Sequence, residues 1–324
     1  MRPGLLLSGL GSHDPVDIAE HAEALGYDAV WLPELWGESA PVTATAIAER
    51  TDDLTVGSAI MNVFSRSPAV LAMTAVSLAE RSGNRFVLGV GTSTRKAIED
   101  LHGADFDRPV RRAHETIELV REFTRGDGRV DYDGELFSVA DFPSLEHSVP
   151  VYGAALGSAN RRMVGRLCDG WMPHNVPFTR IDESFETVAA AAREANRDPD
   201  EITVAPYVPI AVSDDPAAAR AAIRGHVAYY VGSGEGYQRA VAEAFPDGAD
   251  AVADAWRSGD RDDARSAVTD EMVDALGIAG TADDARAALE ELMAETVVDR
   301  PILVVPSGAG ELAQGTIEAL APDG

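Results

Sequence analysis

Short apolar runs alternate with amphipathic stretches along almost the whole chain, and this alternation constrains the fold more than any other feature. Each apolar run suits one buried strand, and each amphipathic stretch repeats its apolar residues with a helical period. Alternation of this kind predicts parallel strands joined by crossover helices. The expected strands are residues 3–7, 28–33, 54–61, 85–90, 149–153, 169–172, 202–210 and 301–305, and the expected helices are residues 15–25, 42–50, 68–81, 110–125, 158–167, 180–196, 217–230 and 311–320.

This order of elements is typical of an α/β chain folded as a (β/α)8 TIM barrel, and we expect a single such domain over residues 1–324. A doubly wound open sheet is the alternative architecture. That sheet normally carries a glycine-rich nucleotide-binding turn after its first strand, and residues 8–13 match such a turn poorly. The sequence therefore favours the barrel.

Two segments depart from the repeat. Residues from about 127 to 140 partly alternate and contain Asp133-Gly134, which predicts a small hairpin. Residues from about 232 to 280 are rich in glycine and then helical and acidic, so we expect an insertion before the last strand that shapes the mouth of the barrel. Helix starts are expected at the N-caps Asp14 and Ser67, and at two capping boxes, Thr179 with Asp182 and Thr281 with Asp284.

An excess of acidic residues dominates the composition. The chain has 54 Asp and Glu against 27 Lys and Arg, a formal net charge of −27, in clusters spread along the chain. Such a surface repels nucleic acid and anionic lipid, so we expect neither as a partner. Concentrated salt would screen the self-repulsion of this coat. We therefore expect a halophilic, salt-requiring fold.

The remaining composition points to the cytoplasm. No run of about 18 apolar residues occurs, and the amino terminus reaches Asp14 and Asp17 too soon for a secretory signal. Cys168 is the single cysteine, which excludes an internal disulfide. The seven histidines lack metal-binding spacings, so we expect no metal. The absence of a G-x-S-x-G elbow argues against a serine hydrolase.

Reactive residues of such a barrel gather at the carboxyl ends of its strands. Glycine- and serine-rich turns follow the fourth and fifth expected strands, and backbone N–H groups in such turns can hold a phosphate, although tight turns need the same residues for geometry alone. His102, His174 and His226 could reach the mouth from loops. The candidate site residues are Glu34, Trp36, Ala59, Ile60, Asn62, Gly91, Thr92, Ser93, Ala154, Gly157 and Ser158.

A family resemblance rests on segments spread over nearly the whole chain, whose order and spacing matter more than any one of them. They are Ala24-Leu25-Gly26-Tyr27-Asp28-Ala29-Val30-Trp31, Glu34 with Trp36-Gly37, Ser65-Arg66-Ser67-Pro68, Asn84-Arg85-Phe86-Val87-Leu88-Gly89-Val90-Gly91, Phe106-Asp107-Arg108-Pro109 and Cys168-Asp169-Gly170-Trp171. Together they resemble the luciferase-like monooxygenase superfamily. Within it, they resemble the coenzyme F420-dependent branch related to methylenetetrahydromethanopterin reductase.

The resemblance implies an F420 cofactor that lies across the carboxyl face of the barrel. Its phosphate would lie near Gly91-Thr92-Ser93 and Gly157-Ser158, with added charge from Lys96 and Arg161. A cis peptide between Ala59 and Ile60 would press on the ring from behind. The resemblance also implies a homodimer. The implied side-chain roles are hydrogen bonding of ring heteroatoms by Asn62, a polar contact or proton relay by Glu34, and a wall on the substrate side by Trp36.

The implied function is hydride transfer between F420 and a small organic substrate, with reduction of a methylene-tetrahydropterin or folate as one form. Two departures leave the substrate open. Tetrahydropterin reductases carry an acidic residue on the first strand, where this chain has Leu5 to Ser8, and sugar-phosphate dehydrogenases have a histidine where this chain has Leu35. The alternatives are an FMN-dependent monooxygenase served by a partner reductase, and a flavin-binding barrel without turnover.

Overall fold

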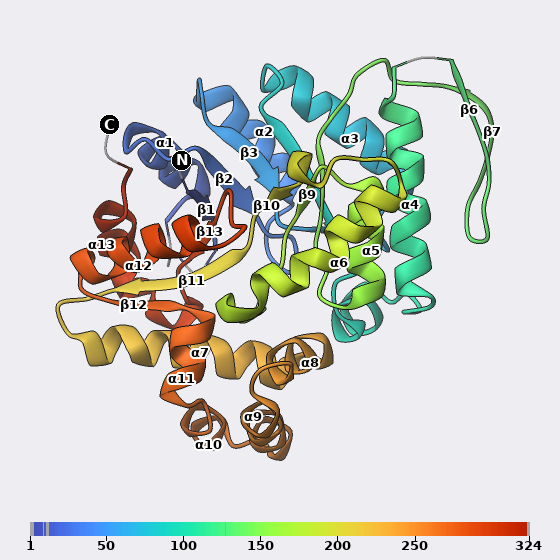
Figure 1. Cartoon of the computed structure of the whole chain (residues 1–324). Coiled ribbons are helices and arrows are strands. Elements are labelled where there is room, and N and C mark those ends of the chain that lie inside the picture. The colour runs from blue at the N-terminus through green and yellow to red at the C-terminus, as the bar shows by residue number, and fades with distance from the viewer. Residues whose placement is uncertain (1–2, 9, 11–12, 127, 323–324) are drawn as a thin grey trace.

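Within the described residues, the main sheet contains eleven strands, and all its pairings are parallel. The computed structural model describes residues 3–8, 10, 13–126 and 128–322. The expected barrel is confirmed (Figure 1). Its strands are β1 (Gly4–Leu6), β2 (Ala29–Leu32), β3 (Thr55–Ser58), β4 (Met61–Asn62), β5 (Phe86–Gly91), β8 (Val151–Gly153), β9 (Gly170–Trp171), β10 (Thr203–Val204), β11 (Tyr207–Val212), β12 (Ile278–Gly280) and β13 (Ile302–Val304).

Two expected strands are each divided in two, and these predictions were wrong in detail. The third expected strand stops at Ser58 and resumes as β4, with a cis peptide between Ala59 and Ile60 in the gap. The expected strand 202–210 is β10 followed by β11. β10 pairs with β9 and β11 pairs with β13, so this break closes the ring. Pro206 lies at the break, where it has no N–H to donate, and its carbonyl accepts from Ile302 at 2.8 Å.

Helices cover the outside of the ring (Figure 1). They are α1 (Pro15–Ala24), α2 (Ala40–Arg50), α3 (Pro68–Arg81), α4 (Pro109–Thr124), α5 (Ser158–Leu167), α6 (Ile181–Glu194), α7 (Pro216–Ser233), α12 (Ala282–Glu295) and α13 (Ala313–Ala319), with short helices η1 (Ala97–Leu101), η2 (Phe178–Arg180), η3 (Pro199–Glu201) and η4 (Ser307–Leu312). The N-caps Asp14 and Ser67 are confirmed, and so is the capping box of Thr281 with Asp284.

The expected capping box of Thr179 with Asp182 was wrong. Thr179 lies inside η2, and the residue before α6 is Arg180, without a side-chain cap. The Asp182 carboxylate instead accepts from the backbone N–H of Val297 at 2.9 Å, a residue 115 positions away. A tertiary contact therefore uses the carboxylate that the local pattern assigned to the helix start.

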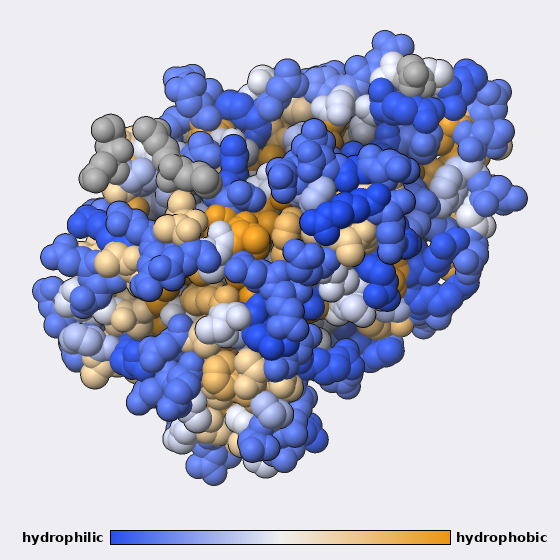
Figure 2. Space-filling model, in the orientation of Figure 1, coloured by the Kyte–Doolittle hydropathy of each residue, from blue (hydrophilic) through white to orange (hydrophobic). Residues whose placement is uncertain are grey.

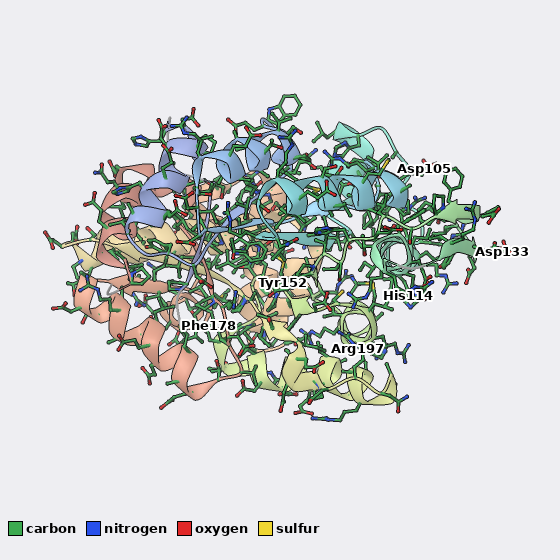
Figure 3. All side chains as sticks on the ribbon, turned by 90° about the horizontal axis from the view of Figure 1, so that it is seen from above. Asp105, His114, Asp133, Tyr152, Phe178 and Arg197 are labelled. Carbon is green, nitrogen blue, oxygen red and sulfur yellow. The ribbon has the colours of Figure 1, made fainter. Side chains whose placement is uncertain are left out.

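Large rings fill the interior of the barrel. Trp31 and Tyr152 are both buried there with ring centroids 5.7 Å apart, and Figure 3 shows Tyr152 near the middle of the molecule. Glycines face these rings because no larger residue fits. A Cβ on Gly57 would lie 2.4 Å from the Trp31 ring, and one on Gly170 would lie 2.6 Å from the Tyr152 ring. The interior is therefore a packed core, as is usual for this fold.

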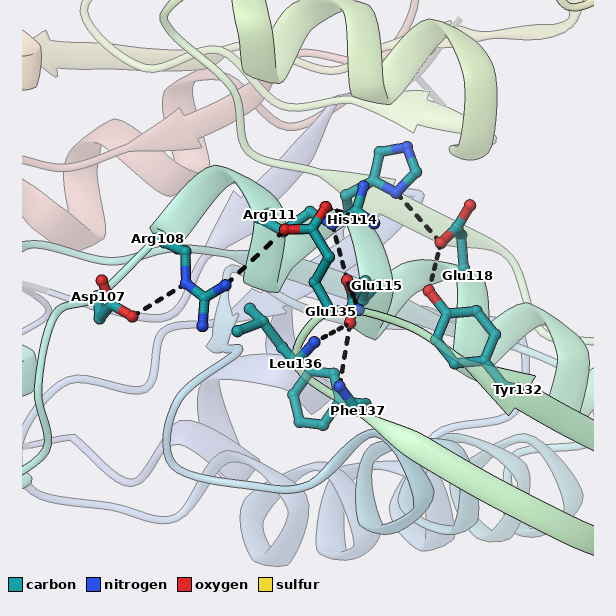
Figure 4. A network of polar contacts seen from close by, with 10 residues as sticks. All are labelled: Asp107, Arg108, Arg111, His114, Glu115, Glu118, Tyr132, Glu135, Leu136 and Phe137. Carbon is teal, nitrogen blue, oxygen red and sulfur yellow. Dashed lines mark hydrogen bonds and ion pairs between the residues drawn. The ribbon is translucent and has the colours of Figure 1, made fainter.

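An antiparallel hairpin, β6 (Arg129–Asp133) with β7 (Ser138–Pro143), projects from the ring (Figure 1). Residue 127, where the hairpin was expected to begin, lies outside the described residues. The buried Glu115 of α4 holds the hairpin turn by accepting from the N–H groups of Glu135, Leu136 and Phe137 at 2.8, 2.9 and 3.1 Å (Figure 4). Arg111 donates to the same carboxylate at 2.7 Å.

The segment before β12 forms four helices that pack with α7 around an apolar core of their own (Figure 1). They are α8 (Glu235–Ala242), α9 (Pro246–Ser258), α10 (Arg261–Ser266) and α11 (Asp270–Leu276). Strand β12, which the sequence did not predict, then pairs with the carboxyl end of β11.

Hydrophilic residues cover most of the face shown in Figure 2, with apolar residues gathered near its centre. This coat agrees with the acidic composition. Among the described residues, no helix combines the length and the apolar character needed to cross a bilayer.

Candidate functional site

Three of the expected cofactor-binding residues come together at the carboxyl ends of β3, β5 and β8. A Cβ placed on Gly91 would lie 3.1 Å from the Ala154 Cβ and 3.2 Å from the Ile60 Cγ1. Ile60 is half-buried and follows the cis peptide after Ala59. The cis peptide that the resemblance implied is therefore present. These residues form a small apolar cradle, and the lack of a side chain at Gly91 lets Ile60 and Ala154 approach this strand closely.

Asn62 lies beside this cradle with its side chain buried. Its Oδ1 accepts from the backbone N–H groups of Phe64 and Ser65 at 3.0 and 2.8 Å, so it caps the turn after β4. Its Nδ2 lies 3.3 Å from the Nε2 of His102. The Asn62 oxygen is thus engaged by the turn, and the amide nitrogen is the atom that faces a second partner.

The glycine and serine turns hold the other expected residues. Gly157 is the N-cap of α5, no side chain caps this helix, and a Cβ on Gly157 would meet no atom within 4 Å. Ser158 begins the helix and is exposed. Thr92 and Ser93 follow β5, and Ser93 has a φ of 57°. An uncapped helix start that opens to space presents N–H donors suited to an anion.

The two cations expected near this turn differ in whether their N–H donors are already paired. Lys96 is exposed and its Nζ pairs with Asp100 at 2.7 Å. Arg161 is 6% exposed, and its nearest acidic partner is Glu243 at 3.7 Å. Its Nε and Nη2 atoms are buried without a hydrogen-bond partner among the described residues, and burial lowers its pKa. Arg161 is therefore a buried cation with unused donors.

The loop after β2 carries the two expected catalytic residues in different settings. Glu34 forms a two-pronged ion pair with Arg66, one bond of which measures 2.7 Å, and accepts from the N–H of Ala40 at 3.2 Å. The pair joins the loop after β2 to the loop after β4. Trp36 is 84% exposed, so its indole does not pack on the rim of the barrel.

Sequence reasoning gave little weight to a group of rings near the barrel mouth. His174 stacks on Tyr207 with ring centroids 4.6 Å apart, and its Nε2 lies 3.3 Å from the Nε2 of His226. Tyr230 and Tyr237 lie 4.2 and 5.4 Å from the His174 ring, centroid to centroid. We call these five residues the His–Tyr cluster. The sequence does not show that Tyr230 and Tyr237 face His174, because these residues are far apart from it along the chain.

Burial sets the electrostatics of the His–Tyr cluster. It lowers the pKa of His226 to about 3 and holds the pKa of His174 well below its ordinary value, with a smaller contribution from His226. It also raises the pKa of Tyr237 to about 12. All these groups are neutral at neutral pH, so each histidine carries one ring proton, and between the facing nitrogens one N–H donates and the other nitrogen accepts. Within the described ranges, no three His, Cys, Asp or Glu side chains form a metal-binding group.

The comparison with known proteins identifies the family. The model of the luciferase-like monooxygenase family matches residues 5–300. The chain belongs to this family. One relative, the 5,10-methylenetetrahydromethanopterin reductase of Methanolobus tindarius, is 30% identical over 279 residues, which cover 85% of each protein. The F420-dependent glucose-6-phosphate dehydrogenase of Mycobacterium avium is 30% identical over 224 residues, 62% of this chain and 65% of that protein.

Solved structures of luciferase-like proteins share the fold of the whole chain. The coenzyme F420-dependent tetrahydromethanopterin reductase from Methanopyrus kandleri superposes with a TM-score of 0.82 at 23% identity, covering 99% of this chain and 97% of that one. The first strand of this chain lacks the acidic residue of the tetrahydropterin reductases, and the structure shows what takes its place. Leu6 of β1 belongs to the apolar interior, so the first strand presents no acid there.

Proposed function

We propose that this protein is an F420-dependent oxidoreductase that transfers a hydride between the deazaflavin and a small organic substrate. The observation that carries the proposal is the apolar cradle of Ile60, Gly91 and Ala154 at the carboxyl ends of the strands. The F420-dependent relatives support the choice of cofactor. The Methanolobus tindarius relative supports a methylene-tetrahydropterin or folate as one substrate. The apolar Leu6 on the first strand argues against this substrate, because tetrahydropterin reductases carry an acidic residue on that strand.

The residues present fit such a cofactor. Ile60 and Ala154 offer an apolar surface for a flat ring, and Gly91 lets them lie close together because it has no side chain between them. The uncapped start of α5 at Gly157 offers N–H donors for a phosphate. When bound, F420 supplies or accepts the hydride. The chain itself would contribute by holding ring and substrate in contact, which lowers the barrier through orientation.

Fluorescence-monitored binding of F420 and FMN to the purified chain in high salt tests this function. We expect F420 to bind at least tenfold more tightly than FMN. A Gly157→Val variant should reduce F420 affinity at least tenfold, because the new side chain enters the space in front of the helix start while meeting no protein atom. Gly315→Val on α13, also in open space, is the matched control. Tighter FMN binding would support the monooxygenase alternative. Unchanged F420 affinity in Gly157→Val would mean that the phosphate of F420 does not bind at this turn.

Glu34 is proposed as a polar contact or proton relay at the ring. If it has this role, a Glu34→Gln variant should lose at least tenfold in kcat, because the amide can no longer exchange a proton. The melting temperature should fall only slightly, since one hydrogen bond to Arg66 survives. Glu38→Gln, an exposed neighbour in the same loop, is the control. Equal turnover of both variants would leave Glu34 as a structural partner of Arg66.

We also propose a homodimer through α2 and α3. The side chains of Val42 and Met73 are 70% and 49% exposed, and Val70 is 40% exposed, beside a groove between the two helices. Apolar side chains gathered in this way mark an interaction surface. Light scattering after size exclusion should give a dimer for the wild type and a monomer for Val42→Glu with Met73→Glu. A wild-type monomer would contradict the proposal.

The acidic coat supports a salt-requiring fold. With a net charge of −27, the folded chain should gain stability as potassium chloride screens its self-repulsion. The melting temperature should therefore rise steadily with salt. A circular dichroism spectrum and melting temperature that do not change at low ionic strength would count against this proposal.

A further inference from the structure

The His–Tyr cluster adjoins the cradle proposed for the cofactor ring. Tyr207 belongs to the apolar interior of the barrel, and Ile60 and Ala154 pack against that same interior group. Helix α8, which carries Tyr237, also lies over the loop that follows Ala154, because a Cβ on Gly236 would be 3.8 Å from Leu156 Cδ1. The cluster therefore lines the mouth of the barrel on the side of α7 and α8.

Among the described residues, no charged side chain forms a hydrogen bond, an ion pair or a cation–π contact with the cluster. Within the part of the chain that the structure describes, its rings contact one another and Tyr229, and no Lys, Arg, Asp or Glu pairs with them. His174 and His226 are 8% and 7% exposed and neutral, and Tyr230 keeps its proton because burial raises its pKa. The mouth is polar here without carrying charge.

Several polar atoms at this place lack a partner. Among the described residues, the hydroxyls of Tyr207, Tyr230 and Tyr237 form no hydrogen bond with another residue, and none of the three oxygens is fully buried, so each stays open to solvent or to a ligand. The neighbouring Asn175 is 3% exposed, and neither its Nδ2 nor its Oδ1 is bonded. A buried polar group without a partner costs free energy that an apolar ring of the same shape would not. Asn175 carries this cost, and the tyrosine hydroxyls beside His174 keep unused donors and acceptors, so these groups are suited to a ligand.

We propose that the His–Tyr cluster, with Asn175, is the substrate subsite and that it admits an uncharged head group bearing a hydroxyl or carbonyl oxygen. This inference rests on the proposed function and names its substrate class. Neutral histidine nitrogens, tyrosine hydroxyls and an amide can donate to and accept from such an oxygen. A phosphate or carboxylate in the same place would be buried without a counter-charge, which is strongly unfavourable.

Ligand-observed NMR titrations of the full chain in high salt test the subsite, with cyclohexanol, cyclohexanone and cyclohexanecarboxylate as probes. Each is titrated with and without F420. We expect the alcohol and the ketone to bind at least tenfold more tightly than the carboxylate. Tyr230→Phe and His226→Gln should each weaken alcohol binding at least threefold. Tyr229→Phe, one residue away and 49% exposed, should change it less than twofold.

The results separate this inference from the proposed cofactor. F420 affinity, followed by fluorescence, should be the same in all three variants, because none of the changed residues belongs to the cradle. Failure of F420 to bind would contradict the proposed function. The probe titrations without F420 would still test the subsite in that case. Equal binding of the carboxylate, equal effects of Tyr230→Phe and Tyr229→Phe, or no binding of any probe would overturn the subsite.

Discussion

A Glu115→Ala variant is expected to lose about 3 kcal/mol of the free energy of unfolding, because backbone N–H groups of the hairpin turn lose the buried carboxylate that accepts from them. The substitution leaves three backbone N–H groups of the hairpin turn and the guanidinium of Arg111 without their shared acceptor. Denaturant unfolding in high salt measures the change. Glu290→Ala, an exposed glutamate on α12, is the control and should stay within about 0.5 kcal/mol of wild type.

The pH dependence of this difference has a defined sign. Burial alone would raise the pKa of Glu115, but the three backbone donors and Arg111 outweigh it and hold the pKa below its ordinary value of 4.5. The stabilisation is therefore present above pH 4.5 and disappears as the pH falls through the lower folded-state pKa. The gap between wild type and Glu115→Ala should narrow in acid. A change below about 1 kcal/mol at neutral pH would mean that the hairpin opens independently of the barrel.

A Gly89→Ala variant is expected to lose about 3 kcal/mol or more, at the upper end of overpacking effects. The new Cβ would lie 1.9 Å from the carbonyl oxygen of Ser58 and 3.1 Å from the sulfur of Met172. Ser58 cannot move freely, because its Oγ bonds both the N–H and the carbonyl of Gly89 at 2.9 Å. Strands β3 and β5 must then separate just before the cradle, so F420 affinity should fall as well.

The same exchange at an open position provides the control for Gly89. Gly315→Ala lies in α13 with no atom within 4 Å of its Cβ, and it should stabilise the chain by about 0.5 to 1 kcal/mol through helix propensity. Opposite signs for the two exchanges are the expected result. A Gly89→Ala variant that is as stable as wild type would mean that the strands shift apart without cost, contrary to the packing described for β3 and β5.

The candidate site could be predicted in part. The motif at residues 84–91 pointed to Gly91, and the structure brings this residue against Ile60 and Ala154 from two other strands. The pairing of Glu34 with Arg66 was not predicted, since the loops after β2 and β4 are 32 positions apart at these residues. The role of each residue at the cofactor remains a prediction that the binding experiments test.

The sequence by itself determined the order of strands and helices and most helix starts. These depend on residues a few positions apart, such as Ser67 before α3 or Thr281 with Asp284 before α12. Only the tertiary structure decided where the strand at residues 203–212 divides and which buried groups meet. His174 and His226 are 52 positions apart, and Glu115 holds a turn about 20 residues away. Packing removes these polar groups from water, so they must pair with whichever groups the fold brings near them, and a local sequence pattern cannot specify those partners.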